Sequence, residues 1–129
     1  MGQPITTTVG ICFAFPDVCQ TPVPGSPSPV PVPYPNIGQL SLAAPVASSV
    51  LVGGNPVVTS NSEIETTTGD EAGSAGGPGT FAGKVVFKTS SQSVNAEGNG
   101  VVRMFDTTEQ NNGNAVGTVL GGVPNVLVG

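Results

Sequence analysis

The stretch VLVGGNPVVTS, residues 50–60, decides the fold class. Two short runs of β-branched residues flank a Gly-Gly-Asn-Pro turn, which is the pattern of a β-hairpin. A second stretch, VNAEGNGVVRM at residues 94–104, repeats the form Gly-Asn-x-Val-Val, and Gly122-Val123-Pro124-Asn125-Val126 is a weaker relative of it. Two or three similar hairpins in one chain predict a pseudo-symmetric assembly, whose units bury their apolar faces on each other or on a partner.

The composition around these hairpins favours an all-β chain. With 19 glycines and 13 prolines among 129 residues, long helices are unfavourable. Residues 37–50 are the one place for a short helix, and Pro45 limits it. A disordered matrix or linker protein is an alternative class, but many β-branched residues and little charge favour an ordered chain.

Two further segments have a predicted backbone geometry. Val9, Ile11, Phe13 and Phe15 recur with period two, so residues 8–15 are predicted to form a strand that buries this face. Residues 21–36, TPVPGSPSPVPVPYPN, are rich in proline, which predicts stiff polyproline II without internal hydrogen bonds. The tail, residues 111–129, carries short Val and Leu strands broken at glycine and proline.

Several functions are excluded by charge and residue usage. Three basic residues and a net charge of -5 do not suit nucleic-acid binding, and the chain has no histidine for acid–base or metal chemistry. The acidic stretch at residues 62–72 is predicted to be a solvated turn, because Asp70 and Glu71 are adjacent and would point apart on a strand. The glycine-rich loop 73–80 lacks the Gly-Lys-Ser/Thr ending of a phosphate loop. We therefore expect no enzymatic activity.

We expect a single domain over residues 1–129 without a membrane-spanning segment. The first residues, MGQPITTTVG, lack the basic and apolar regions of a signal peptide. The protein is expected to be synthesised in the cytoplasm, and any role outside the cell would need another route of export.

The two cysteines, Cys12 and Cys19, have three interpretations. They can be buried free thiols, a local disulfide across a turn at Pro16, or two ligands of a metal site. Zinc takes four ligands, and no histidine is present to complete the set. Both cysteines are therefore weak metal candidates.

The order of motifs along the chain resembles the PAAR-like family. The resemblance covers roughly residues 10–115. It rests on five motifs: Asp17-Val18-Cys19-Gln20-Thr21-Pro22, Pro31-Val32-Pro33-Tyr34-Pro35-Asn36-Ile37, Gly54-Asn55-Pro56-Val57, Thr68-Gly69-Asp70-Glu71-Ala72-Gly73 with Gly76-Gly77, and Gly98 through Arg103 with Asp106.

The resemblance implies a small β-rich cone with pseudo-threefold character. Such proteins cap the blunt end of a trimeric, VgrG-like β-helical spike, with one tip per trimer. The spikes belong to contractile injection machines: type VI secretion systems, extracellular injection particles and phage-like tails. A tip of this kind sharpens the needle for membrane puncture, touches the target membrane transiently, and can carry an effector or adaptor.

The resemblance also implies a metal, because PAAR proteins typically bind zinc near the apex through histidines and a cysteine. This chain has Gln110-Asn111 where relatives often show a histidine. Cys12 and Cys19 are the only soft ligands left, so we expect no zinc and no other cofactor.

Four valines are candidates for the spike-docking base or for the small core: Val57, Val58, Val101 and Val102. The alternative to a spike tip is a β-rich binding module that recognises a surface ligand or docks an effector. Such a site would use an exposed aromatic residue, for which Tyr34 is the candidate.

Overall fold

A computed structural model describes residues 2–129 and shows an all-β protein, which confirms the predicted class. Its one helical element is a single 3₁₀ turn, and within the described residues no helix is long and apolar enough to cross a membrane. The elements are β1 (Gln3–Ile5), β2 (Ile11–Thr21), β3 (Val30–Gln39), η1 (Leu40–Leu42), β4 (Ala43–Ala44), β5 (Ala47–Val52), β6 (Asn55–Val57), β7 (Glu63–Ile64), β8 (Val85–Phe87), β9 (Asn95–Ala96), β10 (Asn99–Gly100), β11 (Thr107–Gln110), β12 (Ala115–Val119) and β13 (Val123–Val128).

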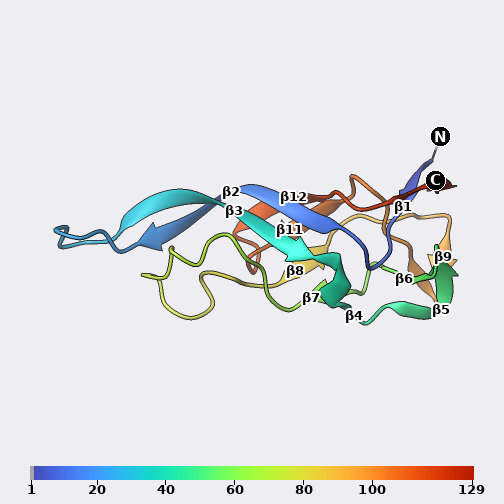
Figure 1. The fold of residues 1–129 in the computed structure, drawn as a ribbon, viewed down its shortest axis with the longest axis horizontal. Coiled ribbons are helices and arrows are strands. Elements are labelled where there is room, and N and C mark those ends of the chain that lie inside the picture. Colours follow the sequence, from blue (N-terminus) through green and yellow to red (C-terminus); the bar gives the residue numbers. More distant parts are fainter. Residues whose placement is uncertain (1) are drawn as a thin grey trace.

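Most of these strands form one antiparallel sheet of seven strands in the order β3-β2-β12-β11-β8-β7-β4. The long β2–β3 hairpin projects at one end of the elongated molecule, as Figure 1 shows. A loop between β7 and β8 extends toward the same end (Figure 1). We call this part the hairpin end.

The opposite end is built from three two-stranded sheets, β5·β6, β9·β10 and β1·β13. Figure 1 shows β1 and the C-terminal end of the chain at this end of the molecule, together with β5 and β9. The first two sheets are the hairpins predicted at residues 50–60 and 94–104. We call the three sheets the arms.

A closed cycle of hydrogen bonds joins the three arms. The N–H of Thr6 donates to the carbonyl of Val102 (2.9 Å), that of Val102 donates to Val58 (2.9 Å), and that of Val58 donates back to Thr6 (3.0 Å). The arms are therefore related by a pseudo-threefold axis, as the repeated hairpins predicted.

A second cycle runs around the arms in the opposite direction, with donors two residues after, and acceptors two residues before, the members of the first cycle. Its donor–acceptor pairs are Thr8 to Pro56 (3.2 Å), Ser60 to Gly100 (2.8 Å) and Met104 to Pro4 (2.8 Å). Each pair of arms is therefore joined by two backbone hydrogen bonds, one in each direction, so all three junctions have the same backbone arrangement.

The third copy of the repeat lies at the N-terminus, not at residues 122–126 as the sequence suggested. Gly2-Gln3-Pro4-Ile5-Thr6 corresponds to Gly54-Asn55-Pro56-Val57-Val58, while residues 123–128 form its partner strand β13. The register agrees, because Gln3 faces Val128 as Asn55 faces Val52. The third arm is thus assembled from the two ends of the described chain, which breaks the strand–turn–strand signal in the sequence.

The interior holds two apolar clusters that meet at the hydrogen-bonded cycle. Val57 and Val101 belong to the cluster between the arms, and Val58 and Val102 belong to the cluster under the large sheet. All four valines are buried, so the structure places the docking-or-core candidates in the interior. Burying each side chain is worth roughly 1.5–3 kcal/mol, so these positions stabilise the junction of the two clusters.

The strand predicted at residues 8–15 is present within β2, but the prediction had the wrong face buried. Cys12 and Ala14 point inward, whereas Phe13 and Phe15 are 37% and 57% exposed. Their cross-strand partners are Gly38 and Gly117, where an added Cβ would lie 2.9 Å from Val85 and 2.5 Å from Gln110, so the space on the inner face is narrow and suits small side chains.

The prediction of polyproline II for residues 21–36 is wrong for residues 30–36. These residues belong to β3 and pair with β2. The outward-directed N–H of Ile37 donates to Thr68 (2.8 Å). Pro35, Pro33 and Pro31 follow at alternate positions along the same free edge and have no N–H. The edge strand therefore offers no donor there to a further strand.

The helix considered for residues 37–50 does not form. The chain there makes only η1 and then enters β4 and β5. Pro45 follows β4. Strand β4 pairs with β7, and β5 pairs with β6, so pairing between strands supplies the backbone hydrogen bonds that a helix would otherwise have made.

Candidate functional site

The family-like motifs converge on one buried polar cluster near the hairpin end. Its members come from four separate segments: Asp17 and Cys19 on β2, Asn36 on β3, Asp70 on the loop after β7, and Asn111 and Asn114 on the turn between β11 and β12. We call this group the Asp17–Asp70 cluster. Asp17, Cys19, Asn36, Asp70 and Asn111 are all almost fully buried.

Asp17 lies at the centre of the cluster and accepts most of its hydrogen bonds. Its Oδ1 accepts from Nδ2 of Asn111 (3.0 Å) and Nδ2 of Asn114 (2.6 Å). Its Oδ2 accepts from Nδ2 of Asn36 (3.2 Å). Charge-assisted bonds of this kind are about twice as strong as neutral ones, so Asp17 links β2 to β3 and to the turn between β11 and β12.

Asp70 extends the network to the loop. Its Oδ1 accepts from the backbone N–H of Ala82 (2.9 Å), and its Oδ2 accepts from Nδ2 of Asn36 (3.2 Å). The sequence interpretation of a solvated acidic turn is therefore wrong for Asp70, whose side chain is inside the protein while Glu71 next to it is exposed. Buried amide donors on other strands, which no local pattern reveals, make this burial favourable.

The two carboxyl groups have opposite pKa shifts. Burial, followed by the hydrogen bond with Asp17, raises the pKa of Asp70 to about 6. Burial acts the same way on Asp17, but hydrogen bonds from Asp70, Asn111 and Asn114 outweigh it and hold the pKa of Asp17 below its ordinary value. A pair of close carboxyl groups favours one retained proton, so Asp70 is the member that holds it in mildly acidic solution.

Cys19 lies against both carboxyl groups as a neutral thiol. Its Sγ is 3.6 Å from Oδ1 of Asp17 and 3.5 Å from the carbonyl oxygen of Thr80. Burial and then the charges of Asp17 and Asp70 raise the pKa of Cys19 to about 12. Cys12 lies apart in the core, where burial also raises its pKa to about 12. Both cysteines are free and buried, which matches the first of the three interpretations.

Two close approaches of glycine backbone allow the loop to close over the cluster. A Cβ on Gly73 would collide with Cβ of Cys19 and lie 2.9 Å from the ring of Tyr34. A Cβ on Gly83 would lie 2.8 Å from Oδ1 of Asn111. Only glycine leaves room at these two contacts.

Tyr34 is part of this packing. Its hydroxyl is 2.7 Å from Oγ1 of Thr21, and its ring faces Gly73. The half-buried ring is therefore occupied by internal contacts, and the structure gives no support to its role as an exposed recognition residue.

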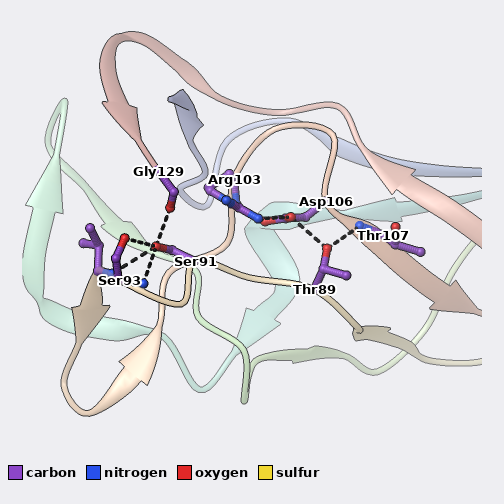
Figure 2. Close-up of polar contacts among 8 residues, drawn as sticks. Thr89, Ser91, Ser93, Arg103, Asp106, Thr107 and Gly129 are labelled. Atoms are coloured by element: carbon purple, nitrogen blue, oxygen red, sulfur yellow. Dashed lines mark hydrogen bonds and ion pairs between the residues drawn. The ribbon is translucent and has the colours of Figure 1, made fainter. Parts of the chain in front are cut away.

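A second polar network ties the arms to the large sheet, as Figure 2 shows. The guanidinium of Arg103 donates to both carboxylate oxygens of Asp106 (2.8 and 3.1 Å), and Oγ1 of Thr89 donates to the same carboxylate (2.7 Å). In the loop between β8 and β9, which also contains Thr89, the hydroxyl of Ser91 donates to the carbonyl of Gly129 (2.6 Å) and holds the residue that follows β13 (Figure 2).

The residues of the Asp17–Asp70 cluster other than Cys19 were not identified as site residues from sequence. Three of them, Asp17, Asn36 and Asp70, stand in the motifs Asp17-x-Cys19, Pro-Tyr-Pro-Asn36 and Thr-Gly-Asp70 that carry the family resemblance. The small polar residues in those motifs were the sequence feature that could have identified these three as members of a common site. For Asn111 the signal was its place next to the position where relatives often show a histidine, whereas Asn114 carried no signal, because only the fold brings their turn against β2.

Comparison with known proteins agrees with these motifs. A family model described as Toxin PAAR-like domain matches residues 10–117, and the chain belongs to this Tox-PAAR-like family. Among curated proteins, it is similar to the DNase toxin Tse7 of Pseudomonas aeruginosa strain PAO1, with 37% identity over 105 residues. The match covers 76% of this chain and 27% of Tse7, so the chain corresponds to about a quarter of that protein. No solved structure matches significantly.

Proposed function

We propose that this chain is a non-enzymatic spike tip, which caps a trimeric, VgrG-like spike of a contractile injection machine with one tip per trimer. The observation that supports this most is the double cycle of hydrogen bonds around the pseudo-threefold axis. A single chain with three equivalent arms can meet the end of a threefold-symmetric partner with the same contacts to each subunit.

The arms provide apolar contact area for such a partner. Leu51 on β5 and Leu127 on β13 occupy equivalent positions, opposite Pro56 and Pro4, and are 59% and 61% exposed. The third arm has Asn95 at this position. Exposed leucines at symmetry-related sites suit an interface that is completed by docking.

The opposite end has the features of a stiff point. The β2–β3 hairpin pairs along its length, the Asp17–Asp70 cluster holds the neighbouring loop against it, and no charged residue lies between Asp17 and Glu63. The hairpin beyond Asp17 has no charged side chain, although the neighbouring loop carries the exposed Glu71. The uncharged hairpin and its proline-lined edge reduce the cost of transient contact with a membrane interface. Membrane puncture, by a machine that carries the tip out of the cytoplasm and into a target cell, is the role that we assign to this end.

The resemblance to Tse7 supports a role in effector delivery. The chain matches only 27% of that toxin, and we propose that the matching part is the structural carrier and that DNase activity belongs to the rest. Within residues 2–129, no pair of a nucleophile and a base faces the groove of about 530 Å³ beside Cys19, whose lining is largely glycine, asparagine and threonine. Attachment of an effector or an adaptor protein is part of the same proposal.

The test is a binding experiment with a trimeric, VgrG-like spike protein from the same organism. We expect a complex of one tip and three spike chains by light scattering. Leu51→Asp should weaken binding about tenfold or more, since burying a leucine contributes roughly 1.5–3 kcal/mol. Val116→Asp is the matched control, because Val116 is 67% exposed on the large sheet away from the arms.

Two results would contradict the proposal. One is the absence of a complex with the folded tip, or a complex with three tips per trimer. The other is a loss of binding that is equal for Leu51→Asp and Val116→Asp, since this would place the interface away from the arms.

A further inference from the structure

The Asp17–Asp70 cluster raises the question of a metal ion. The ligand atoms of Asp17, Cys19 and Asp70 lie within 4.8 Å of one another, and zinc is the metal that the family resemblance implies. We propose that this cluster is instead a metal-independent clamp, in which side-chain amides of the chain occupy the space that an ion and its fourth ligand would need. This proposal does not depend on the spike-tip function.

The first support is that every carboxylate oxygen of the pair already accepts a hydrogen bond. Asn111 and Asn114 donate to Oδ1 of Asp17, and the N–H of Ala82 donates to Oδ1 of Asp70. One N–H of Asn36 donates to Oγ1 of Thr67 (2.8 Å), and the other is shared between Oδ2 of the two carboxyl groups (3.2 Å each). A metal would need some of these lone pairs, and each displaced N–H would lose a partner in the interior. Within residues 2–129, no buried side-chain nitrogen or oxygen lacks a partner.

The second support is that neighbouring backbone groups fix which way the amides point. Oδ1 of Asn111 accepts from the N–H of Gly83 (2.9 Å), so its Nδ2 must face Asp17, and that Nδ2 also donates to the carbonyl of Thr80 (3.0 Å). Nδ2 of Asn114 donates to the carbonyl of Val18 (2.9 Å). The donors therefore cannot be exchanged for acceptors by rotating the amide groups.

The third support is the state of the thiol. Zinc binds cysteine as thiolate, whereas Sγ of Cys19 lies 3.6 Å from Oδ1 of Asp17 in the position of a donor. Nδ2 of Asn111 lies 3.7 Å from the same sulfur and 3.0 Å from Oδ1 of Asp17. This amide group thus stands between two of the candidate ligands, where a tetrahedral ion would have to sit.

The clamp has a mechanical consequence. It fastens the loop that contains Asp70 and the turn that contains Asn111 to strands β2 and β3, which are distant in sequence. The hairpin end is then held together by hydrogen bonds that form with folding and need no supply of metal.

The first experiment measures the metal content and thermal stability of the purified protein. We expect less than one tenth of an equivalent of zinc, and the same melting temperature with EDTA or with added Zn²⁺. One equivalent of bound zinc, or a melting temperature that falls in EDTA, would overturn the proposal.

The second experiment converts the clamp into a metal site. Asn111→Asp keeps the acceptor for Gly83 but replaces Nδ2 by an oxygen, which creates a set of three carboxylates and one cysteine. The variant should bind one equivalent of Zn²⁺ and melt at a higher temperature with Zn²⁺ than with EDTA. Asn112→Asp is the matched control, because Asn112 is the exposed neighbour in the same turn and donates to Gly79 away from the cluster.

Asn111→His is a second variant for the same test, since Asn111 has a φ of 51°, a conformation that histidine tolerates better than most residues. If Asn111→Asp does not fold in EDTA, refolding with Zn²⁺ should restore its circular dichroism spectrum. If both Asn111 variants fold and neither binds zinc, the amide of Asn111 is not what excludes the ion, and the proposal is wrong.

Discussion

Replacing Asp17 by asparagine is expected to destabilise the protein by about 2–6 kcal/mol. The substitution turns one acceptor oxygen into an NH₂ group that faces the amide donors of Asn36, Asn111 or Asn114. Two or more buried donors then lack an acceptor, and each such group costs roughly 1–3 kcal/mol. For a domain of this size the melting temperature should fall by roughly 10 °C or more.

Asp70→Asn is the matched substitution in the same cluster. Its Oδ1 can still accept from Ala82, and its Nδ2 can donate to Asp17 where the pair otherwise shares a proton. We expect a loss of about 1 kcal/mol or less from its altered contact with Asn36. The assay is urea unfolding followed by circular dichroism at pH 5 and pH 7.5.

The two pH values separate the roles of the pair. The pKa of Asp70 is raised from 3.8 to about 6 by folding, so its contribution to stability is full below pH 4 and is lost as the pH rises through about 6. The pKa of Asp17 is lowered, so its contribution is present above its unfolded pKa and is lost in stronger acid. The wild-type protein should lose stability between pH 5 and pH 7.5, and Asp70→Asn should lose less. Equal destabilisation by the two substitutions, or an unchanged pH profile in Asp70→Asn, would refute this account of the cluster.

Three further predictions concern other parts of the molecule. Pro33→Thr restores an N–H on the free edge of β3, so the variant should self-associate at high concentration in size-exclusion chromatography while the parent elutes unchanged; identical elution would show that the edge prolines do not prevent pairing. Val58→Ala and Val102→Ala should each cost about 1–3 kcal/mol in urea unfolding, because the two sites are equivalent in the hydrogen-bonded cycle; a difference beyond about 1.5 kcal/mol would argue against equivalent packing. Cys12 and Cys19 should resist iodoacetamide at pH 8 in the folded protein and react in urea, since both are buried with pKa values of about 12; rapid labelling of the native protein would contradict their placement.

The local sequence predicted the two hairpins that are contiguous in the chain. Residues 94–104 contain both strands of their hairpin, and residues 50–60 contain β6, the turn and the end of β5, so short-range backbone pairing is enough to specify β5·β6 and β9·β10. The third arm pairs Gln3 with Val128, and no local pattern reports a partner at the other end of the chain. The same limit explains why residues 122–126 were taken for a copy of the repeat.

The sequence was less informative about which side of a strand is buried. The alternation of apolar residues correctly predicted the strand. The prediction that Phe13 and Phe15 are buried rested on their hydrophobicity alone and was wrong. The inner face is limited by the distance to neighbouring strands, and Cys12 and Ala14 fit there. Burial depends on the space that other segments leave, and this space is not encoded in the pattern of one strand.

The all-β class, two of the three hairpins and the family can be predicted from the residues alone. These depend on turn residues, β-branched runs and motifs whose parts are close together in the chain. The closed cycle of three arms and the shared burial of Asp17, Asp70 and Asn111 become visible in the folded protein. The reason is that hydrogen bonds between distant segments exist only after the chain has folded, when each buried polar group takes whichever partner the fold brings within reach.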